Sequence, residues 1–237
     1  MKTLIIIPTY NEKENISDIL PQIFSETKEI DVNILIVDDG SPDGTANIVK
    51  DMIQKNYKDK LFILERSGKQ GLATAYITGF KWGIERNYDV FIEMDADFSH
   101  NPKYLKEMIG LMQKYDFIVA SRYVKNGGVV GWGPIRKIIS YGGSFYSRMV
   151  LGIKIRDLTG GFNLWSKDLL LKLGLDNIIS RGYLFQIELK YRATKMGFKG
   201  IEFPIIFPDR ERGKSKMSKK IFLEALINIW KIRKIKF

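Results

Sequence analysis

Five short apolar runs, each followed by a segment with helical spacing, occupy the first half of the 237-residue chain. The runs cover residues 3–7, 33–37, 61–64, 90–94 and 117–121, and most of their side chains are β-branched or aromatic, as is usual in strands. Between the first two runs, apolar residues recur every three or four positions, at Ile16, Ile19, Leu20 and Ile23. Near-continuous apolar strands that alternate with helices predict an α/β fold with a mostly parallel sheet covered on both faces.

The second half of the sequence continues this pattern and ends in a basic segment. Helices are expected at 134–150, 167–173 and 183–195, a strand near 199–203, and a mobile glycine-rich loop at 123–133. Residues 218–237 have the spacing of a basic amphipathic helix, whose apolar stripe consists of Ile221, Phe222, Ala225, Leu226, Ile229 and Trp230. We therefore predict a main domain over residues 1–217 and a C-terminal helix over residues 218–237.

The composition excludes several kinds of site and indicates a class of partner. The chain has no cysteine, which excludes disulfides, thiolate metal sites and thiol nucleophiles, and its single histidine argues against a histidine metal cluster. No apolar run reaches the roughly 20 residues that a membrane-spanning helix needs. The net charge of +11 indicates a nucleic acid, an anionic membrane surface or a phosphorylated substrate as partner. Ten basic residues, against two acidic ones, lie between Arg210 and Phe237.

Polar residues follow the first two apolar runs, where the carboxyl ends of parallel strands usually bind ligands. In "PTYNE" (8–12), Tyr10 offers a flat face to a nucleobase, while Asn11 fits either a helix cap or a ligand-binding residue. In "DDGSPDGT" (38–45), residues 41–44 have the residue types of a tight turn. The two acids before that turn, Asp38 and Asp39, suit hydrogen bonds to a base or a ribose.

The motif "MDADFSH" (94–100) follows the fourth apolar run and places Asp95 and Asp97 on the same face of an extended chain. One interpretation is a solvated strand end before a helix that starts at Asn101–Pro102. The other is an acidic rim, shared with the acids at 38–39, whose repulsion a divalent cation relieves. Mg²⁺ and Mn²⁺ typically bind one or two carboxylates together with substrate phosphates, so this interpretation favours a nucleoside diphosphate. The two common nucleotide fingerprints, G-x-x-x-x-G-K-[ST] and G-x-G-x-x-G, are absent.

These three motifs, in this order and each after a strand, resemble those of the family 2 inverting glycosyltransferases with the GT-A (Rossmann-like) fold. Within that family the sequence is most similar to the dolichol-phosphate and polyprenol-phosphate mannose synthases. The similarity extends through "GLATAYITGF" (71–80), "ASRYVKNGGVVGWGPIRKIIS" (120–140), "DLTGGFNLW" (157–165), "RGYLFQIEL" (181–189) and "DRERGKSKM" (209–217). The resemblance implies a GT-A catalytic domain over residues 1–217, GDP-mannose as donor and a dolichyl or polyprenyl phosphate as acceptor.

The resemblance also implies roles for individual residues. The nucleotide would be bound by Pro8, Tyr10, Glu12, Val37, Asp39, Lys69, Asp95 and Ala96. The metal ion, Mg²⁺ or Mn²⁺, would be held by Asp95, Asp97 and Ser99, the last at a position where many relatives have glutamine. The acceptor phosphate would be bound by Arg122, Arg136, Ser140, Arg210 and Lys216, because guanidinium groups offer forked donors to phosphate oxygens and stay charged. The residues expected to act in catalysis are Asp95, Asp97, Arg122, Arg136 and Arg210.

The expected reaction needs no general base. A phosphate monoester has a second pKa near ~6 and is largely dianionic at neutral pH, so it is already a nucleophile. It would attack the anomeric carbon of an α-linked sugar nucleotide in a single displacement and give a β-linked product. Positioning of the acceptor and stabilisation of the departing diphosphate would then supply the catalysis.

Several alternatives stay open on the sequence alone. UDP-glucose or another sugar nucleotide is an alternative donor, since few contacts read the orientation of a hydroxyl group. A nucleic-acid-binding protein would explain the charge, but no reading motif is present and nucleic acid is not expected as a partner. A nucleotidyltransferase would also use Mg²⁺ and two carboxylates, but it should have a glycine-rich basic loop soon after the first strand.

The route to a lipid acceptor is a separate question. We expect a cytoplasmic protein that is peripheral at the cytoplasmic face of a membrane. Its C-terminal helix would either lie in the interface, with Trp230 and Phe237 buried in lipid, or pack its apolar stripe on the domain. A membrane-anchoring partner subunit is the further possibility.

Overall fold

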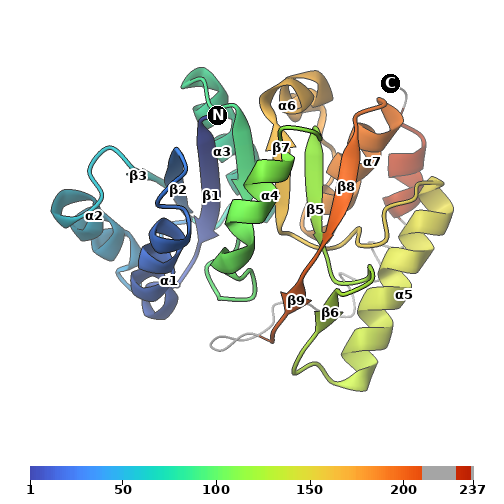
Figure 1. Ribbon diagram of the computed structural model, residues 1–237, viewed down its shortest axis with the longest axis horizontal. Coiled ribbons are helices and arrows are strands. Elements are labelled where there is room, and N and C mark those ends of the chain that lie inside the picture. Colours follow the sequence, from blue (N-terminus) through green and yellow to red (C-terminus); the bar gives the residue numbers. More distant parts are fainter. Residues whose placement is uncertain (210–227, 236–237) are drawn as a thin grey trace.

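A seven-stranded sheet forms the centre of the protein, whose computed structural model describes residues 1–209 and 228–235 (Figure 1). The strand order is β3-β2-β1-β4-β7-β5-β8. These strands are β1 (Thr3–Thr9), β2 (Val32–Asp38), β3 (Leu61–Glu65), β4 (Val90–Glu93), β5 (Phe117–Ser121), β7 (Asn163–Ser166) and β8 (Gly200–Pro204). All neighbours pair in parallel except β7, which is antiparallel to both β4 and β5. The expected mostly parallel α/β sheet is confirmed.

Helices cover both faces of the sheet, because successive side chains of a strand point to opposite sides. The helices are α1 (Lys13–Glu26), α2 (Thr45–Lys55), α3 (Leu72–Glu85), α4 (Leu105–Leu111), α5 (Pro134–Leu151), α6 (Lys167–Leu173) and α7 (Tyr183–Lys195), with two short 3₁₀ helices, η1 (Pro102–Tyr104) and η2 (Leu175–Asn177). In β1, Ile5 and Ile7 pack with α1, α2 and α4, whereas Leu4 and Ile6 pack with α3, α6 and α7. All four side chains are fully buried, so β1 lies at the middle of two apolar layers.

The sheet has a topological switch point between β1 and β4. From β1 the chain builds β2 and β3 outward to one side, whereas β4 pairs with the opposite edge of β1. At such a point the connections leave the carboxyl ends of the strands in opposite directions and form a crevice. These ends lie at the lower edge of the sheet in Figure 1, and the segments 8–12, 38–45 and 94–100 all leave the sheet there, as the sequence predicted.

Two parts of the sheet structure were not predicted. Strand β7 has four residues, with polar Asn163 and Ser166 at its ends, and it is inserted between β4 and β5. Strand β6 (Gly128–Val129) pairs in parallel with β9 (Ile206–Phe207) in a small second sheet. The segment 123–133, expected to be a mobile loop, therefore carries a hydrogen-bonded strand.

Described residues 228–233 near the C-terminus are helical and pack on the domain (dark red in Figure 1). Ile229 and Ile232 are buried in a cluster with residues of α5 and α7, and the half-exposed Trp230 donates its Nε1–H to the hydroxyl of Tyr146 at 3.0 Å. Of the two positions considered for the C-terminal segment, in the membrane interface or packed on the domain, the second is therefore correct for Ile229. The other residues of the predicted stripe, Ile221, Phe222, Ala225 and Leu226, and Phe237 lie outside the described residues.

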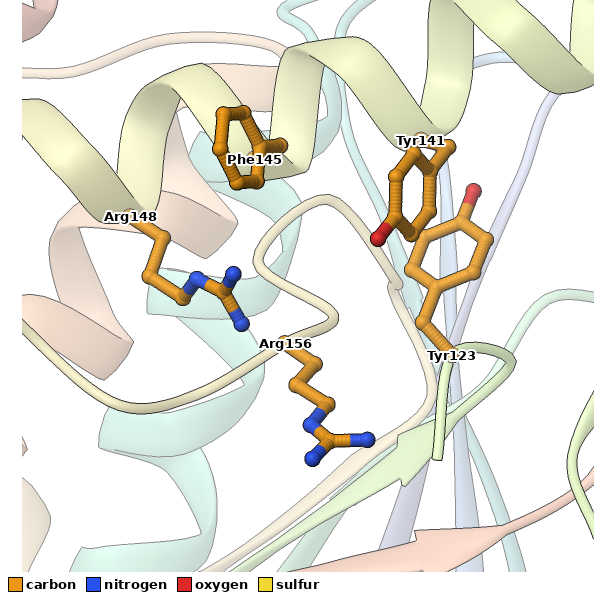
Figure 2. A pocket seen from close by; sticks show the side chains of 5 residues that line it. All are labelled: Tyr123, Tyr141, Phe145, Arg148 and Arg156. Atoms are coloured by element: carbon orange, nitrogen blue, oxygen red, sulfur yellow. The ribbon is translucent and has the colours of Figure 1, made fainter. Parts of the chain in front are cut away.

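Helix α5 has an unusually apolar exposed side. Ile135, Ile138 and Met149 are 73%, 71% and 66% exposed. Further along the helix, α5 also lines a cavity of about 300 Å³ (Figure 2). Among the helices that the structure describes, none has both the length and the apolar character needed to cross a bilayer.

Close packing of α3 on the sheet depends on a glycine. A Cβ atom at Gly83 would lie 2.5 Å from Phe91 Cε1 and 2.6 Å from Leu4 Cδ2, in a fully buried layer. We expect Gly83→Ala to lower the free energy of unfolding by about 1–3 kcal/mol through overpacking, measured by urea denaturation. Gly110→Ala in α4 is the matched control, because no atom lies within 4 Å of its added Cβ, and it should raise stability by up to about 1 kcal/mol. Equal effects of the two changes would contradict this account.

Candidate active site

The segment after β1 brings two predicted nucleotide-binding residues together. The Lys69 ammonium lies 4.6 Å from the centroid of the Tyr10 ring, which is a cation–π contact. Asn11 has a left-handed φ of 59°, and its backbone N–H donates to Ser41 Oγ at 3.0 Å, which ties this segment to the turn after β2. The N-cap of α1 is Glu12, without a side-chain capping bond. The helix-cap interpretation of Asn11 is therefore wrong.

Asp38 belongs to the turn after β2 and not to an acidic rim. It is buried, and its Oδ1 accepts hydrogen bonds from Thr9 Oγ1 at 2.7 Å and from Ser41 Oγ at 2.6 Å. Its Oδ2 accepts the backbone N–H of Ser41 at 2.8 Å. These bonds fasten the ends of β1 and β2 to each other. The predicted rim of four carboxylates is thus reduced to three.

Asp39 is paired with Arg66, the first residue after β3. Arg66 Nε donates to Asp39 Oδ1 at 2.5 Å, and Arg66 Nη2 forms an ion pair with the same oxygen. The backbone N–H groups of Gln70 and Gly71 donate to Oδ2 at 3.2 and 3.4 Å. Arg66 was missed from the sequence, although its position directly after a parallel strand is the same signal that indicated the acids. The protein itself therefore balances the charge of Asp39.

The remaining predicted nucleotide-binding residues differ in exposure. The side chains of Val37 and Ala96 are buried in the core, at 0% and 3% exposed, so contact with a nucleotide would have to come from their backbone atoms. Pro8 and Glu12 are partly exposed. The Glu12 Oε2 atom accepts from Asn15 Nδ2 at 2.8 Å, which orients this carboxylate at the start of α1.

Asp95 and Asp97 follow β4 and are held by neighbouring polar groups. Asp97 is buried, and its Oδ1 accepts from Ser99 N at 3.1 Å and from Ser99 Oγ at 2.5 Å. The backbone N–H of Asp95 donates to Nδ1 of the buried His100 at 2.8 Å, so the one histidine fixes the backbone of this motif. The Tyr76 hydroxyl lies 3.5 Å from Asp95 Oδ1. Burial raises the pKa of Tyr76, and the charge of Asp95 adds to this effect, so the phenol stays protonated and donates.

Two carboxylates at the switch point fit a hard divalent cation. Mg²⁺ and Mn²⁺ prefer oxygen ligands and complete their shells with water and substrate phosphates. Within residues 1–209 and 228–235 there is no group of three or more acidic or histidine side chains suited to a metal ion, so the protein would supply only part of the shell. The hydroxyl of Ser99, the third predicted ligand, donates to Asp97 and orients that carboxylate.

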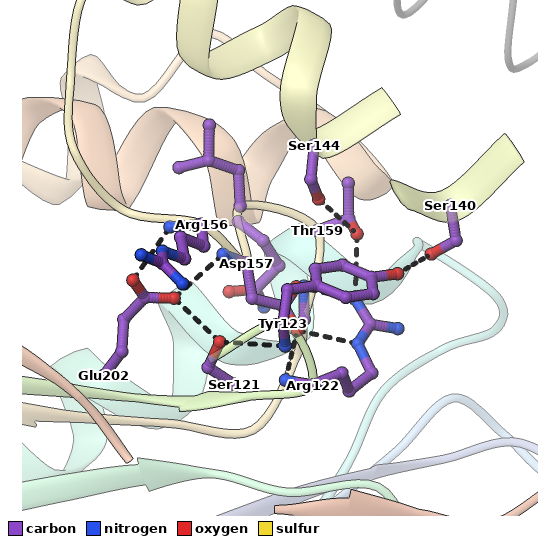
Figure 3. Close-up of polar contacts among 12 residues, drawn as sticks. Ser121, Arg122, Tyr123, Ser140, Ser144, Arg156, Asp157, Thr159 and Glu202 are labelled. Atoms are coloured by element: carbon purple, nitrogen blue, oxygen red, sulfur yellow. Dashed lines mark hydrogen bonds and ion pairs between the residues drawn. The ribbon is translucent and has the colours of Figure 1, made fainter. Parts of the chain in front are cut away.

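Arg122, predicted to bind the acceptor phosphate, is clamped by the buried Asp157 (Figure 3). Arg122 Nε and Nη2 donate to the two Asp157 oxygens at 2.7 and 2.6 Å, and Nη2 also donates to Thr159 Oγ1 at 2.9 Å. Burial would raise the pKa of Asp157, but the charge of Arg122 and its hydrogen bonds hold this pKa below its usual value. The clamp fixes the orientation of the guanidinium group. Asp157 was read from the sequence only as part of a motif.

Two further charged residues, the buried Lys190 and the partly buried Glu202, hold the loop that carries Asp157. Lys190 Nζ donates to the carbonyl oxygens of Asp157, Leu158 and Gly160 at 3.1, 3.2 and 2.7 Å. Glu202 Oε1 accepts the backbone N–H of Asp157 at 2.9 Å (Figure 3). Burial lowers the pKa of Lys190 to about 8. Lys190, which directly follows the family motif at 181–189, therefore joins α7 to the motif at 157–165 in one polar network.

The same network reaches β4 through Glu93, two residues before the acidic pair. Glu93 is fully buried and accepts hydrogen bonds from Asn163 Nδ2 and Trp165 Nε1 at 2.9 Å, and from Gln186 Nε2 at 3.0 Å. Burial raises the pKa of Glu93 to about 7. Strand β7 thus connects the two sides of the site by polar contacts as well as by backbone pairing.

Arg136, near the start of α5, contacts the same tryptophan ring as Arg122. Both guanidinium groups stack on Trp132, with Cζ atoms 4.0 Å (Arg136) and 5.6 Å (Arg122) from its ring centroid. Arg136 Nη1 also donates to Asp209 Oδ1 at 2.6 Å. The structure therefore brings these two predicted phosphate-binding residues together.

Ser140, the third member of this set, is linked to Arg122 through Tyr123. The Tyr123 hydroxyl donates to Ser140 Oγ at 2.6 Å, and Arg122 Cζ lies 5.1 Å from the Tyr123 ring centroid (Figure 3). Burial raises the pKa of Tyr123, so its hydroxyl keeps its proton. Arg210 and Lys216, the other predicted members, lie outside the described residues.

The doubly wound sheet, with an acidic pair at its switch point and a cluster of arginine residues beyond β7, defines a protein of the GT-A fold class. Residues 4–174 match the model of "Glycosyl transferase family 2", and the chain belongs to this family. The family expected from the motifs is therefore confirmed.

Two curated relatives are similar over nearly their full length. An "Undecaprenyl-phosphate mannosyltransferase" of Micrococcus luteus is 42% identical over 229 residues, which cover 97% of this chain and 93% of that protein. A "Polyprenol monophosphomannose synthase" of Mycolicibacterium smegmatis is 41% identical over 235 residues, which cover 98% of this chain and 88% of that protein.

Solved structures share the fold at low sequence identity. Glucosyl-3-phosphoglycerate synthase of Mycobacterium tuberculosis, in complex with Mn²⁺, uridine diphosphate and phosphoglyceric acid, has a TM-score of 0.72 and 14% identity, covering 100% of this chain and 80% of that chain. A mannosyltransferase of Pyrobaculum calidifontis, in complex with GDP-Man and Mn²⁺, has a TM-score of 0.61 and 16% identity, covering 98% of this chain and 72% of that chain. Both confirm the GT-A architecture.

Proposed function

We propose that the protein transfers mannose from GDP-mannose to a polyprenyl or dolichyl monophosphate, with Mg²⁺ or Mn²⁺ as cofactor. The observation that carries this proposal is the identity of 42% and 41%, over nearly the whole chain, with relatives whose names specify mannosyl transfer to such lipids. A cluster formed by Arg122, Arg136 and Ser140 supports it, because this cluster suits a phosphate monoester. The alternative donor is UDP-glucose.

The donor would occupy the crevice between β1, β2 and β4. Tyr10 and Lys69, in cation–π contact, would meet the nucleotide, and Asp39 would be held for it by Arg66. Asp95 and Asp97 would hold the divalent cation. That cation would neutralise charge on the diphosphate as it leaves.

The acceptor would lie across β7 from the donor. Arg122, fixed by Asp157, and Arg136 would hold the dianionic phosphate, with Arg210 and Lys216 completing the set. A phosphate oxygen forms the new bond to the anomeric carbon, while the bond from that carbon to the diphosphate oxygen breaks and the diphosphate departs with the electron pair. The acceptor carries no proton on the attacking oxygen, so no side chain has to remove one.

A transfer assay with radiolabelled donors tests the proposal directly. With polyprenyl phosphate as acceptor, we expect label from GDP-mannose to enter the lipid fraction and label from UDP-glucose to remain in solution. Transfer from UDP-glucose alone would replace the donor, and transfer from neither would reject the function. Chelation by EDTA should stop the reaction, and added Mg²⁺ or Mn²⁺ should restore it.

Arg136→Ala tests the acceptor side separately. Because its guanidinium would hold the acceptor phosphate, we expect the KM for polyprenyl phosphate to rise about tenfold or more, with GDP-mannose affinity changed less than twofold. Steady-state kinetics with each substrate varied in turn measures both values. A larger loss on the donor side would reject the role of Arg136.

We further propose that the protein acts as a peripheral protein at the cytoplasmic face of the membrane that holds its acceptor. The exposed side chains of Ile135, Ile138 and Met149 on α5 support contact with lipid. Liposome flotation of the full chain, and of a chain that lacks residues 218–237, separates α5 from the C-terminal segment. Complete loss of flotation in the shorter chain would assign binding to that segment, and no flotation of either would favour an anchoring partner subunit.

A further inference from the structure

The cavity beside α5 has no role in the function proposed above. It has a volume of about 300 Å³ and is lined by Tyr123, Tyr141, Phe145, Arg148 and Arg156, a set that we call the α5 pocket (Figure 2). Tyr123 connects this pocket to the predicted acceptor cluster through its hydrogen bond to Ser140. Its size is sufficient for a small anionic group together with the first part of an attached chain.

The α5 pocket combines one helix face with one loop. Tyr141, Phe145 and Arg148 are spaced by four and three residues, so they share one face of α5. Arg156 comes from the segment after the helix, and Figure 2 shows Arg148 extending from α5 toward that segment. Helix and loop thus bring two guanidinium groups to one cavity.

Among the ion pairs of residues 1–209 and 228–235, none includes Arg148 or Arg156. Arg148 instead lies 5.4 Å from the Phe145 ring centroid, and Arg156 uses its backbone N–H to donate to Glu202. Two guanidinium groups at one cavity, neither of them paired with a carboxylate among the described residues, favour an anion, and their forked donors suit phosphate oxygens.

The other wall of the α5 pocket is aromatic and separates it from the acceptor cluster. The rings of Tyr123 and Tyr141 meet edge to face, with centroids 5.4 Å apart. On its far side, the Tyr123 hydroxyl donates to Ser140 of the acceptor cluster. The α5 pocket and the acceptor cluster are therefore neighbours, with Tyr123 between them.

Apolar side chains continue from this pocket along the exposed side of α5. Phe145, which lines the pocket, is 46% exposed. Ile138 and Met149, which belong to the same helix, are 71% and 66% exposed. Exposed apolar side chains next to a basic pocket suit a ligand whose anionic head carries an apolar chain.

We propose that the α5 pocket binds the phosphate of a lipid phosphate ester, as a site additional to the Arg122, Arg136 and Ser140 cluster. Two sources supply this chemistry: a prenyl phosphate monoester, and the headgroup of an anionic phospholipid in a bilayer. The ligand class follows from the lining residues alone, so the inference does not require the proposed sugar transfer.

Binding measurements in the Arg136→Ala background, where the acceptor cluster is weakened, test this inference. Farnesyl phosphate in detergent-free buffer, inorganic phosphate, and vesicles of phosphatidylcholine with phosphatidylglycerol serve as probes. We expect Arg148→Gln with Arg156→Gln to weaken binding of farnesyl phosphate, or retention on the vesicles, by about tenfold or more. Phe145→Ser should weaken farnesyl phosphate binding and leave inorganic phosphate unchanged.

The pattern of losses identifies the source or overturns the inference. Loss of farnesyl phosphate binding assigns the pocket to a prenyl phosphate, and loss of vesicle retention alone assigns it to a phospholipid. Lys58→Gln with Lys114→Gln is the control, because it removes the same charge from exposed residues that precede β3 and β5, at the opposite edge of the sheet. An equal loss in this control, no loss in the pocket variant, or equally tight binding of inorganic phosphate would each overturn the inference.

Discussion

Replacing Asp97 by alanine is expected to reduce sugar transfer by about 100-fold to 1,000-fold while the fold persists. The substitution removes one of the two carboxylates that would hold the cation on the leaving diphosphate, and loss of one charge-stabilising group in a dry site has effects of this size. Asp97 is only 7% exposed and accepts two hydrogen bonds from Ser99, so the carboxylate has a fixed orientation that water could not replace. Steady-state kinetics over a range of Mg²⁺ and Mn²⁺ concentrations measures the effect.

Two companion variants make this result specific. Asp51→Ala removes an exposed carboxylate on α2, and its transfer rate should stay within twofold of the parent. Ser99→Ala keeps the carboxylate but removes the hydroxyl that orients it, so we expect an intermediate loss of about tenfold. Transfer by Asp97→Ala at a near-normal rate, with unchanged metal dependence, would refute the metal assignment. A loss in Ser99→Ala equal to that in Asp97→Ala would make Ser99 a ligand itself.

Asp157→Asn should have the largest effect on stability, a decrease of about 3–5 kcal/mol in the free energy of unfolding. Breaking a buried ion pair leaves the remaining charge without its partner, and here the asparagine oxygen could accept only one of the two forked bonds from Arg122 while its NH2 group faced the other donor. The loop that carries Thr159 and Gly160 would also lose its anchor. Urea denaturation at pH 7 measures the change, and the KM for the lipid acceptor should rise as Arg122 loses its orientation.

A second arginine–aspartate pair in the same region provides the control. Arg136 and Asp209 pair at 2.6 Å, but their side chains are 38% and 42% exposed, so Asp209→Asn should cost less than about 1 kcal/mol. The folded pKa of Asp157 lies below 3.8, so its contribution is present above that value and is lost only as the pH falls through the folded pKa. The difference between the parent and Asp157→Asn should therefore be constant near pH 5 to 6, below the range in which Lys190, whose pKa the Asp157 charge raises, loses its proton. Similar costs for the two substitutions would contradict the buried clamp.

Strands β1 to β5 could be predicted from the sequence because each is marked by a pattern within its own few residues. The runs that became β1 to β5 consist of consecutive apolar residues, and burial on both faces requires that pattern. Strand β7 could not be recognised, because its four residues begin and end with polar side chains whose partners lie far away in sequence. Strands β6 and β9 have two residues each, too few for a periodic signal.

For the site, a position directly after a strand predicted where a residue lies in the fold. The sequence did not predict which residues it contacts there. The acids at 38–39 and 95–97 were expected at one edge of the sheet, and they lie there. The sequence could not tell that Asp38 fastens a turn or that Asp39 pairs with Arg66, because both depend on neighbours from other strands. Likewise, the arginine residues at 122 and 136 fitted a family pattern, but only the fold reveals that Asp157 clamps the first of them.

The late position of β7 in the chain has a consequence for the order in which the protein is made. Residues 3–93 form four adjacent strands through short crossovers, so this half of the sheet can assemble while the ribosome is still translating the rest. Glu93 meets Asn163 only 70 residues later, and until then the outer edge of β4 presents unpaired backbone groups. A nascent chain stalled before Asn163 would therefore carry an unpaired sheet edge that can pair with other chains and aggregate. Chaperone demand should fall sharply once β7 leaves the exit tunnel.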